Sequence, residues 1–167
     1  MNGNTNSFRL EGTAINTTRL VLFTLDDQHY ALHLEAVERI VRAAALTPLP
    51  KAPGVVLGIL DIQGEVIPVI NLRKRFRLAE REIRPSDQFI VARTRSMKVV
   101  LPVDAVESVV EEAELEPLAP AGVMAGMDYV AGVTRTAEGL VLIHDLDTFL
   151  SSEEEKALAD ALAEEQS

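Results

Sequence analysis

Apolar and polar positions alternate over short runs along most of this chain, which is the period of β-strands. Two apolar runs, residues 56–62 and 66–72, are separated only by Gln63, Gly64 and Glu65. A polar break of this length between two such runs predicts a β-hairpin. The basic run that follows predicts a charged exit from its second strand.

A second hairpin is predicted nearer the N-terminus. Residues 20–25 and 29–34 are apolar runs separated by a polar turn that contains Asp26 and Asp27, and aspartate is a favoured turn residue. Residues 35–42 that follow fit either a short helical stripe or a single helical turn that leads into a strand.

The chain repeats itself. Residues 32–41 return as residues 101–110, an offset of 69, and residues 56–72 return as residues 130–146, an offset of 74. A duplicated all-β unit of about 70 residues, with about five short strands, favours small closed barrels over a sandwich.

The ends of the chain differ from this pattern. Residues 1–17 are polar and rich in Asn and Thr, which predicts a flexible arm. Residues 18–150 are expected to form one domain of two lobes, at about 18–86 and 87–150. A serine cap followed by three glutamates and a narrow apolar stripe predicts a C-terminal α-helix over 151–167.

Charge divides the chain into two unlike halves. The net charge of the 167 residues is −10, but residues 18–86 carry 10 basic and 8 acidic side chains, whereas residues 87–167 carry 5 and 17. A protein of this charge is repelled by nucleic acid and by anionic lipid at long range, so a basic surface would act locally on an acidic protein. The cysteine count is zero, and the sequence shows neither a signal peptide nor an apolar anchor, which favours the cytoplasm.

Catalytic chemistry has little support in the sequence. His29 and His33 have the spacing of a helical zinc pair, but in a strand they lie too far apart to share an ion. His144 beside Asp145 has the composition of a base with its orienting carboxylate, and a small β-barrel enzyme or ligand-binding protein with a site there is the alternative function. No glycine-rich phosphate loop is present, so the sequence predicts no catalytic residue, no metal and no cofactor.

A basic string follows the second core strand. It can be a solvated connector, a docking surface for an acidic partner or, least favoured, a nucleic-acid contact. Its members are Arg73, Lys74, Arg75, Arg77, Arg81 and Arg84.

Valines recur in the duplicated segment. Val37 matches Val106 under the offset of 69, with Val41 and Val109 nearby. These side chains either line a groove between the lobes or belong to the core, and the pattern alone does not separate the two.

Three stretches together resemble the CheW-type chemotaxis coupling proteins: residues 58–76, the early hairpin with the segment that follows it, and the capped C-terminal helix. The resemblance implies two intertwined SH3-like five-stranded β-barrels. It also implies a non-enzymatic adaptor, recruited to membrane receptor arrays, that joins the cytoplasmic tip of a chemoreceptor to the regulatory domain of a CheA-type histidine kinase. Nucleic-acid binding and direct membrane insertion are not expected.

The resemblance also implies sites. The receptor tip would dock between the lobes near Val37, Gly58, Val106 and Val109. Partner contacts would fall on the loop of Asp61, Gln63 and Gly64, where the family usually reads Asn-Leu-Arg-Gly. Glutamine keeps hydrogen bonding but lacks the charge and the planar fork of the usual arginine.

Overall fold

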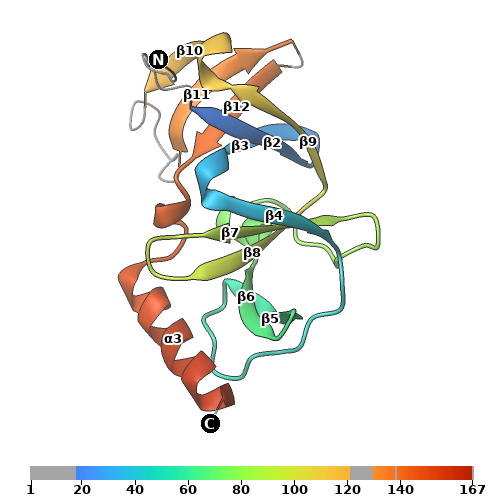
Figure 1. Ribbon diagram of the computed structural model, residues 1–167, viewed down its shortest axis with the longest axis vertical. Coiled ribbons are helices and arrows are strands. Elements are labelled where there is room, and N and C mark those ends of the chain that lie inside the picture. Colours follow the sequence, from blue (N-terminus) through green and yellow to red (C-terminus); the bar gives the residue numbers. More distant parts are fainter. Residues whose placement is uncertain (1–17, 121–129, 138, 167) are drawn as a thin grey trace, which may run out of the picture.

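The computed structural model describes residues 18–120, 130–137 and 139–166, and these residues form two β-sheets stacked along the long axis of the molecule (Figure 1). The six-stranded sheet has the order β10-β11-β12-β3-β2-β9 and the five-stranded sheet has the order β4-β7-β8-β6-β5. The strands of the first are β2 (Arg19–Leu25), β3 (Gln28–His33), β9 (Ala105–Glu111), β10 (Glu116–Pro120), β11 (Val130–Thr136) and β12 (Gly139–His144). Those of the second are β4 (Val37–Arg42), β5 (Val56–Ile62), β6 (Glu65–Ile70), β7 (Gln88–Arg93) and β8 (Lys98–Val103).

The two sheets exchange strands between the sequence halves. Strands β2 and β3 of the first repeat pair with β9 and β12 of the second, while β7 and β8 of the second repeat pair with β4 and β6 of the first. Each sheet therefore combines the first hairpin of one repeat with the later strands of the other. The boundary at residues 86 and 87 divides the repeats but does not divide the sheets.

Local sequence explains the hairpin turns. Asp26 and Asp27 both have positive φ, 51° and 66°, and the β5–β6 turn uses Gln63 at 54° and Gly64 at 89°. Two-residue turns with positive φ at both positions match the twist of the flanking strands, and Asp, Asn and Gly tolerate them best. Both hairpins predicted from the sequence are confirmed.

The five-stranded sheet curls so that its two edges approach each other. The segment after β4 reaches β5, where the Thr47 N–H donates to the Ile59 carbonyl at 3.0 Å and the Ile59 N–H donates to the Thr47 carbonyl at 2.7 Å. Gly58 lies at this crossing, with φ of +157°, and a Cβ added to it would lie 2.6 Å from the Thr47 carbonyl oxygen. The glycine permits the close approach of the two backbones.

One hydrophobic cluster joins both sheets. It includes Phe23 and Leu32 from the six-stranded sheet and Ile90 and Leu101 from the five-stranded sheet, all 0% exposed. A smaller cluster around Phe89 and five further buried side chains lies within the five-stranded sheet. The shared cluster means that the sheets do not pack as independent units.

Short helices connect and cover the sheets. A 3-10 turn, η1 (Leu34–Ala36), leads into β4, so the helical-turn-then-strand alternative for residues 35–42 is the one observed. The others are α2 (Leu72–Arg75), η2 (Glu112–Glu114), η3 (Leu146–Thr148) and α3 (Ser152–Gln166). Helix α3 lies beside the five-stranded sheet and buries Leu158 and Ala161 in the shared cluster (Figure 1).

The expectation of an all-β fold with a C-terminal helix is confirmed. The predicted serine cap of α3 is Ser151, whose Oγ accepts the Glu154 N–H at 3.0 Å while the Ser151 N–H donates to the Glu154 carboxylate at 2.9 Å. The predicted arm at residues 1–17 lies outside the described residues.

Candidate functional site

Strands β4 and β9 are equivalent in the two repeats, and each is the edge of its sheet. Ile40 on β4 is 39% exposed, and its counterpart Val109 on β9 is 53% exposed. Large apolar side chains exposed on edge strands are unusual, because an edge is normally protected from association. Both sheets thus offer an apolar contact at the same position of the repeat.

Val37 and Val106 lie at the N-terminal ends of these two strands. Both are half-buried and pack against the cluster that joins the sheets. Val106 is held further by its backbone N–H, which donates to the Gln88 side chain at 2.7 Å. The two valines therefore combine a core contact with partial exposure, so the structure leaves room for both roles considered from the sequence.

The other candidates for the groove are placed differently. Val41 packs against the smaller cluster of the five-stranded sheet. Gly58 is buried where the backbone of residue 47 crosses it, so its contribution is to the packing of β5. The five predicted residues therefore differ in what they pack against and in how far they are exposed.

The β5–β6 hairpin tip is exposed and ordered by local bonds. The Asp61 carboxylate accepts the Gly64 N–H at 2.8 Å, which holds the turn. The Gln63 Oε1 accepts a hydrogen bond from Nη1 of Arg39 on β4 at 3.4 Å. The structure thus brings Asp61, Gln63 and Gly64 together, and it adds Arg39 from the opposite edge of the sheet.

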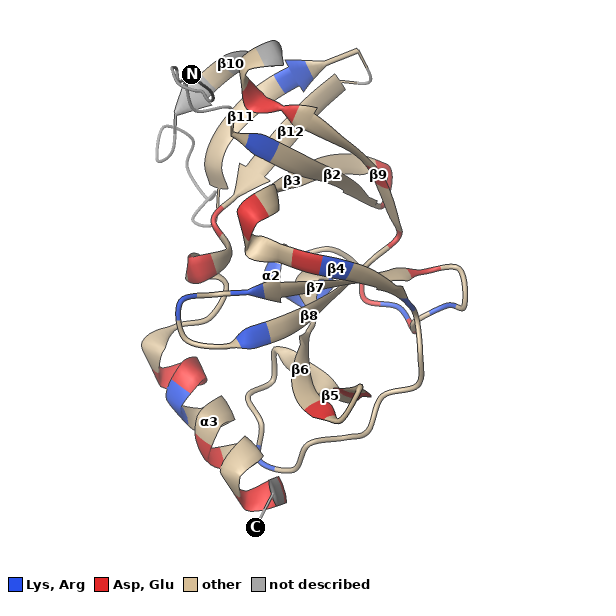
Figure 2. Ribbon diagram, viewed as in Figure 1, with Lys and Arg blue, Asp and Glu red and all other residues tan. Residues whose placement is uncertain are grey.

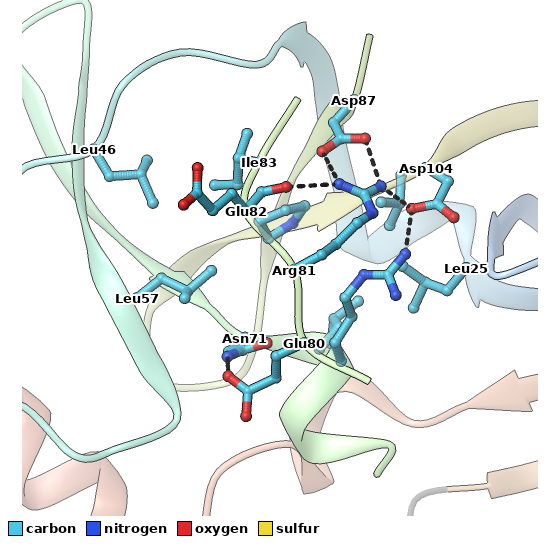
Figure 3. A pocket seen from close by; sticks show the side chains of 14 residues that line it. Leu25, Leu46, Leu57, Asn71, Glu80, Arg81, Glu82, Ile83, Asp87 and Asp104 are labelled. Atoms are coloured by element: carbon cyan, nitrogen blue, oxygen red, sulfur yellow. Dashed lines mark hydrogen bonds and ion pairs between the residues drawn. The ribbon is translucent and has the colours of Figure 1, made fainter. Parts of the chain in front are cut away.

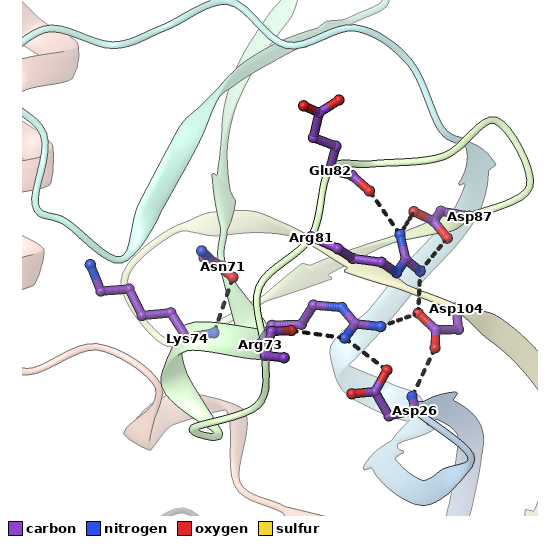
Figure 4. A network of polar contacts seen from close by, with 9 residues as sticks. Asp26, Asn71, Arg73, Lys74, Arg81, Glu82, Asp87 and Asp104 are labelled. Carbon is purple, nitrogen blue, oxygen red and sulfur yellow. Dashed lines mark hydrogen bonds and ion pairs between the residues drawn. The ribbon is translucent and has the colours of Figure 1, made fainter.

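Two arginines of the basic string after β6, Arg73 and Arg81, bind aspartates within the protein (Figure 4). The Arg73 guanidinium donates to Asp26 and Asp104, both at 2.8 Å, and to the Ala79 carbonyl at 3.1 Å. Arg81 binds Asp87 through both terminal nitrogens at 2.8 and 2.9 Å. It also reaches the Asp104 carboxylate at 2.6 Å.

This network joins four parts of the chain: the β2–β3 turn, α2, the connector to β7 and the link from β8 to β9. Burial alone would raise the pKa of Asp104, but the backbone N–H of Asp26 and the guanidinium of Arg73 outweigh it and lower that pKa. Burial alone would likewise raise the pKa of Asp87. Hydrogen bonds from the Arg81 side chain and the Arg84 N–H outweigh burial, so this pKa is lowered. Both carboxylates are therefore held in the charged form.

The remaining members of the string differ in exposure. Arg75 contacts Glu154 of α3 through Nη2 at 2.8 and 2.7 Å, so it anchors the helix. Lys74, Arg77 and Arg84 are exposed. These last three side chains face solvent, whereas Arg73, Arg75 and Arg81 are engaged within the protein.

A pocket of about 450 Å³ lies against the same network (Figure 3). Leu46 and Leu57 form part of its apolar wall, and Arg81, Asp87 and Asp104 lie on its polar side. The guanidinium of Arg81 on this polar side is already bound by two carboxylates, those of Asp87 and Asp104.

His144 lies in an aromatic cluster and not at that pocket. It is 3% exposed, stacks on Phe76 with ring centroids 4.3 Å apart and lies 5.4 Å from the ring of Tyr30. Asp145 is exposed and accepts the Asp147 N–H at 3.0 Å, which caps η3. The buried His144 ring packs among aromatic rings, whereas the Asp145 carboxylate caps η3, and neither residue lines the pocket described above, so the arrangement gives the alternative function no support.

His29 and His33 both lie on strand β3, not on a helix. His29 lies 2.9 Å from Glu107 and His33 lies 3.7 Å from Glu112, so the two histidines have separate carboxylate partners. Within the described residues no group of three or more His, Asp or Glu side chains is arranged to hold a metal ion.

Sequence reasoning missed Arg39 and the three aspartates that bind Arg73 and Arg81. Asp26 was interpreted only as a turn residue, and Asp87 and Asp104 carried no motif. The one available signal was a basic string in a chain of excess negative charge, which favours internal pairing as well as an external partner.

Two interleaved sheets of equivalent topology, with exposed edge strands, define the protein as a small duplicated β-domain. Residues 19–154 match the CheW-like domain family. The chain is 30% identical to the chemotaxis protein CheW of Treponema pallidum over 148 residues, which covers 85% of this chain and 87% of that protein. It is 29% identical to the protein FrzA of Myxococcus xanthus over 117 residues, or 69% and 72% of the two chains.

A solved structure is also similar. The scaffolding protein TtCheW from Thermoanaerobacter tengcongensis superposes with a TM-score of 0.72 at 28% identity, over 83% of this chain and 96% of that one. The chain therefore belongs to the CheW family of chemotaxis scaffold proteins. Within the described residues, no helix has the length and apolar character needed to cross a membrane.

Proposed function

We propose that this protein is a non-enzymatic adaptor that couples the cytoplasmic tips of chemoreceptors to the regulatory domain of a CheA-type histidine kinase. The observation that carries the proposal is the match of residues 19–154 to the CheW-like domain. In this proposal the protein works in the cytoplasm, is recruited to membrane receptor arrays and needs no cofactor.

The geometry supports two kinds of contact. The half-buried Val37 and Val106, with the exposed Val109, offer apolar area to a receptor helix, as in helix-in-groove recognition. The exposed hairpin tip of Asp61, Gln63 and Gly64, beside Arg39 of β4, offers polar contacts. Exposed Lys74 and Arg77 are candidates for an acidic patch on a partner.

The charge of the protein favours protein partners over nucleic acid and anionic membranes. Acidic side chains predominate on α3 (Figure 2), and the net charge of −10 opposes approach to nucleic acid or to an anionic membrane surface. Neither nucleic-acid binding nor membrane insertion is part of the proposal.

The test is assembly of a three-component complex. The protein is mixed with a receptor cytoplasmic fragment and a kinase regulatory domain from the same genome, and binding of each partner is measured alone and together. The proposal expects each partner to bind and the adaptor to retain kinase on immobilised receptor. Failure to bind either partner in this assay would contradict it.

A further inference from the structure

The guanidinium of Arg39 lies beside the β5–β6 hairpin tip, although β4 and β5 are at opposite ends of the strand order. Its Nη1 donates to the Gln63 Oε1 at 3.4 Å, and both side chains are exposed. Gln63 is the first residue of a two-residue turn, with φ of 54°. The turn therefore presents the amide to Arg39 from a fixed backbone position.

The carboxylates around Arg39 have other partners. Glu38 lies 3.3 Å from Lys98 and 3.5 Å from Arg93, and Glu65 lies 2.9 Å from the same lysine. Asp61 accepts the Gly64 N–H. Among the described residues no carboxylate comes within 4 Å of the Arg39 nitrogens. A neutral amide contacts this guanidinium, so its charge is not offset by an ion pair within that part of the chain.

This sets Arg39 apart from three of the five arginines of the basic string. Arg73, Arg75 and Arg81 each bind one or two carboxylates within the protein. An arginine that is bound by a carboxylate has little to offer a partner, whereas one contacted by an amide keeps its charge and most of its five donors. A planar fork of this kind matches a carboxylate with two parallel hydrogen bonds.

We propose that Arg39, and not residue 63, supplies the cation of the partner-contacting hairpin, and that the partner surface docked there presents a carboxylate. The inference rests on the proposed adaptor function and identifies the chemistry of one of its contacts. Gln63 acts as a positioning residue, because its amide accepts one N–H and leaves the outer edge of the guanidinium to the partner. The net charge of −10 confines the attraction to contact distance.

The first measurement compares Arg39→Gln with the unmodified protein. Affinity for the partner that contacts the hairpin, receptor fragment or kinase regulatory domain, should fall about tenfold, as expected when one side of a charged hydrogen-bonded pair is removed. The loss should shrink as salt is raised, because exposed charges are screened. Arg19→Gln is the matched control, since Arg19 is an exposed arginine on the six-stranded sheet; its effect should stay within about twofold.

The second measurement returns the charge to the hairpin. Gln63→Arg in the Arg39→Gln background should recover most of the lost affinity, because the guanidinium then projects from the neighbouring position. Gln63→Arg alone should gain little, since it places two guanidiniums side by side. The two substitutions are therefore expected to be strongly non-additive in a double-mutant cycle.

The outcomes separate the two proposals. Suppose that the unmodified protein binds the partners and that Arg39→Gln binds each of them as tightly as the unmodified protein does, with unchanged thermal unfolding. The role proposed for Arg39 is then wrong, while the adaptor function stands. If the double variant stays as weak as Arg39→Gln, relocation of the charge is overturned. If the unmodified protein binds neither partner, the adaptor function fails and this inference fails with it.

Discussion

Arg75 on α2 binds Glu154 at the start of α3. The Arg75 Nη2 atom lies at 2.8 Å from one carboxylate oxygen and at 2.7 Å from the other. The same carboxylate accepts the Ser151 N–H. One glutamate thus caps its own helix and binds that helix to α2, which follows β6. Because the side chains are only 15% and 27% exposed, solvent weakens this pair less than it weakens a surface pair.

Glu154→Gln should lower the free energy of unfolding by about 1–2 kcal/mol, since a half-buried charged pair and a reciprocal cap are weakened together. Urea denaturation followed by circular dichroism measures the change. Lys51→Ala is the control. Its Lys51–Glu164 pair joins α3 to the link between β4 and β5, but the side chains are 73% and 60% exposed, so its removal should cost less than about 0.5 kcal/mol. Equal losses in the two variants would contradict the special role of Glu154.

Gly58→Ala should destabilise the protein by about 2 kcal/mol or more, because the new methyl group would meet the Thr47 carbonyl oxygen at 2.6 Å and force the backbones apart. Gly64→Ala provides the comparison, since nothing lies within 4 Å of its added Cβ and only the positive φ is strained. That variant should lose about 1 kcal/mol. Thermal unfolding of both variants decides whether Gly58 is a packing residue. Similar losses would favour the groove role expected from the family.

The sequence predicted the local elements of the fold because their signals are local. Alternation marked the strands, polar turn residues marked the hairpins, and a serine followed by glutamates marked the helix start. The repeat offset also pointed to two equivalent sheets. It did not show that β2 and β3 pair with β9 and β12, because either pairing buries the same apolar faces and only three-dimensional packing chooses between them.

The candidate site was less accessible to such reasoning. Whether an arginine faces solvent or a carboxylate depends on partners far away in the chain, such as Asp26, which lies 47 residues from Arg73. The string of basic residues therefore looked uniform, although Arg73 is buried and Arg77 is exposed. Arg39 carried no signal at all, since its contact with Gln63 depends on the curl of the sheet.

The acid limb of the stability curve should depend on the network around Arg73 and Arg81. The pKa values of Asp87 and Asp104 are lowered in the folded protein. Their stabilisation is therefore complete above the unfolded pKa near 4 and is lost as the pH falls through the lower folded values. The free energy of unfolding should therefore fall as the pH drops below about 4.

Asp104→Asn should flatten this acid limb and also lower stability at pH 7 by about 1–2 kcal/mol, because two guanidiniums lose a charged acceptor. Asp160→Asn is the control, because Asp160 is an exposed carboxylate on α3. Urea titrations at a series of pH values give both slopes. An Asp104→Asn curve parallel to that of the unmodified protein would show that the network does not control acid unfolding.

The edge valines should separate a binding surface from the core. Val109 is 53% exposed, so Val109→Asp should leave stability within about 0.5 kcal/mol while it weakens receptor binding severely, because a carboxylate would have to be desolvated in the contact. Val37→Asp and Val106→Asp should weaken receptor binding as well, but each should also cost about 1–3 kcal/mol of stability, since both side chains pack on the cluster that joins the sheets.

Leu140→Asp, at a 48% exposed position on β12, controls for the addition of a surface charge. Receptor affinity measured on folded variants decides between the roles. Unchanged affinity in Val109→Asp would place the receptor elsewhere. If Val37→Asp also unfolds while Val109→Asp binds fully, Val37 and Val106 belong to the core alone.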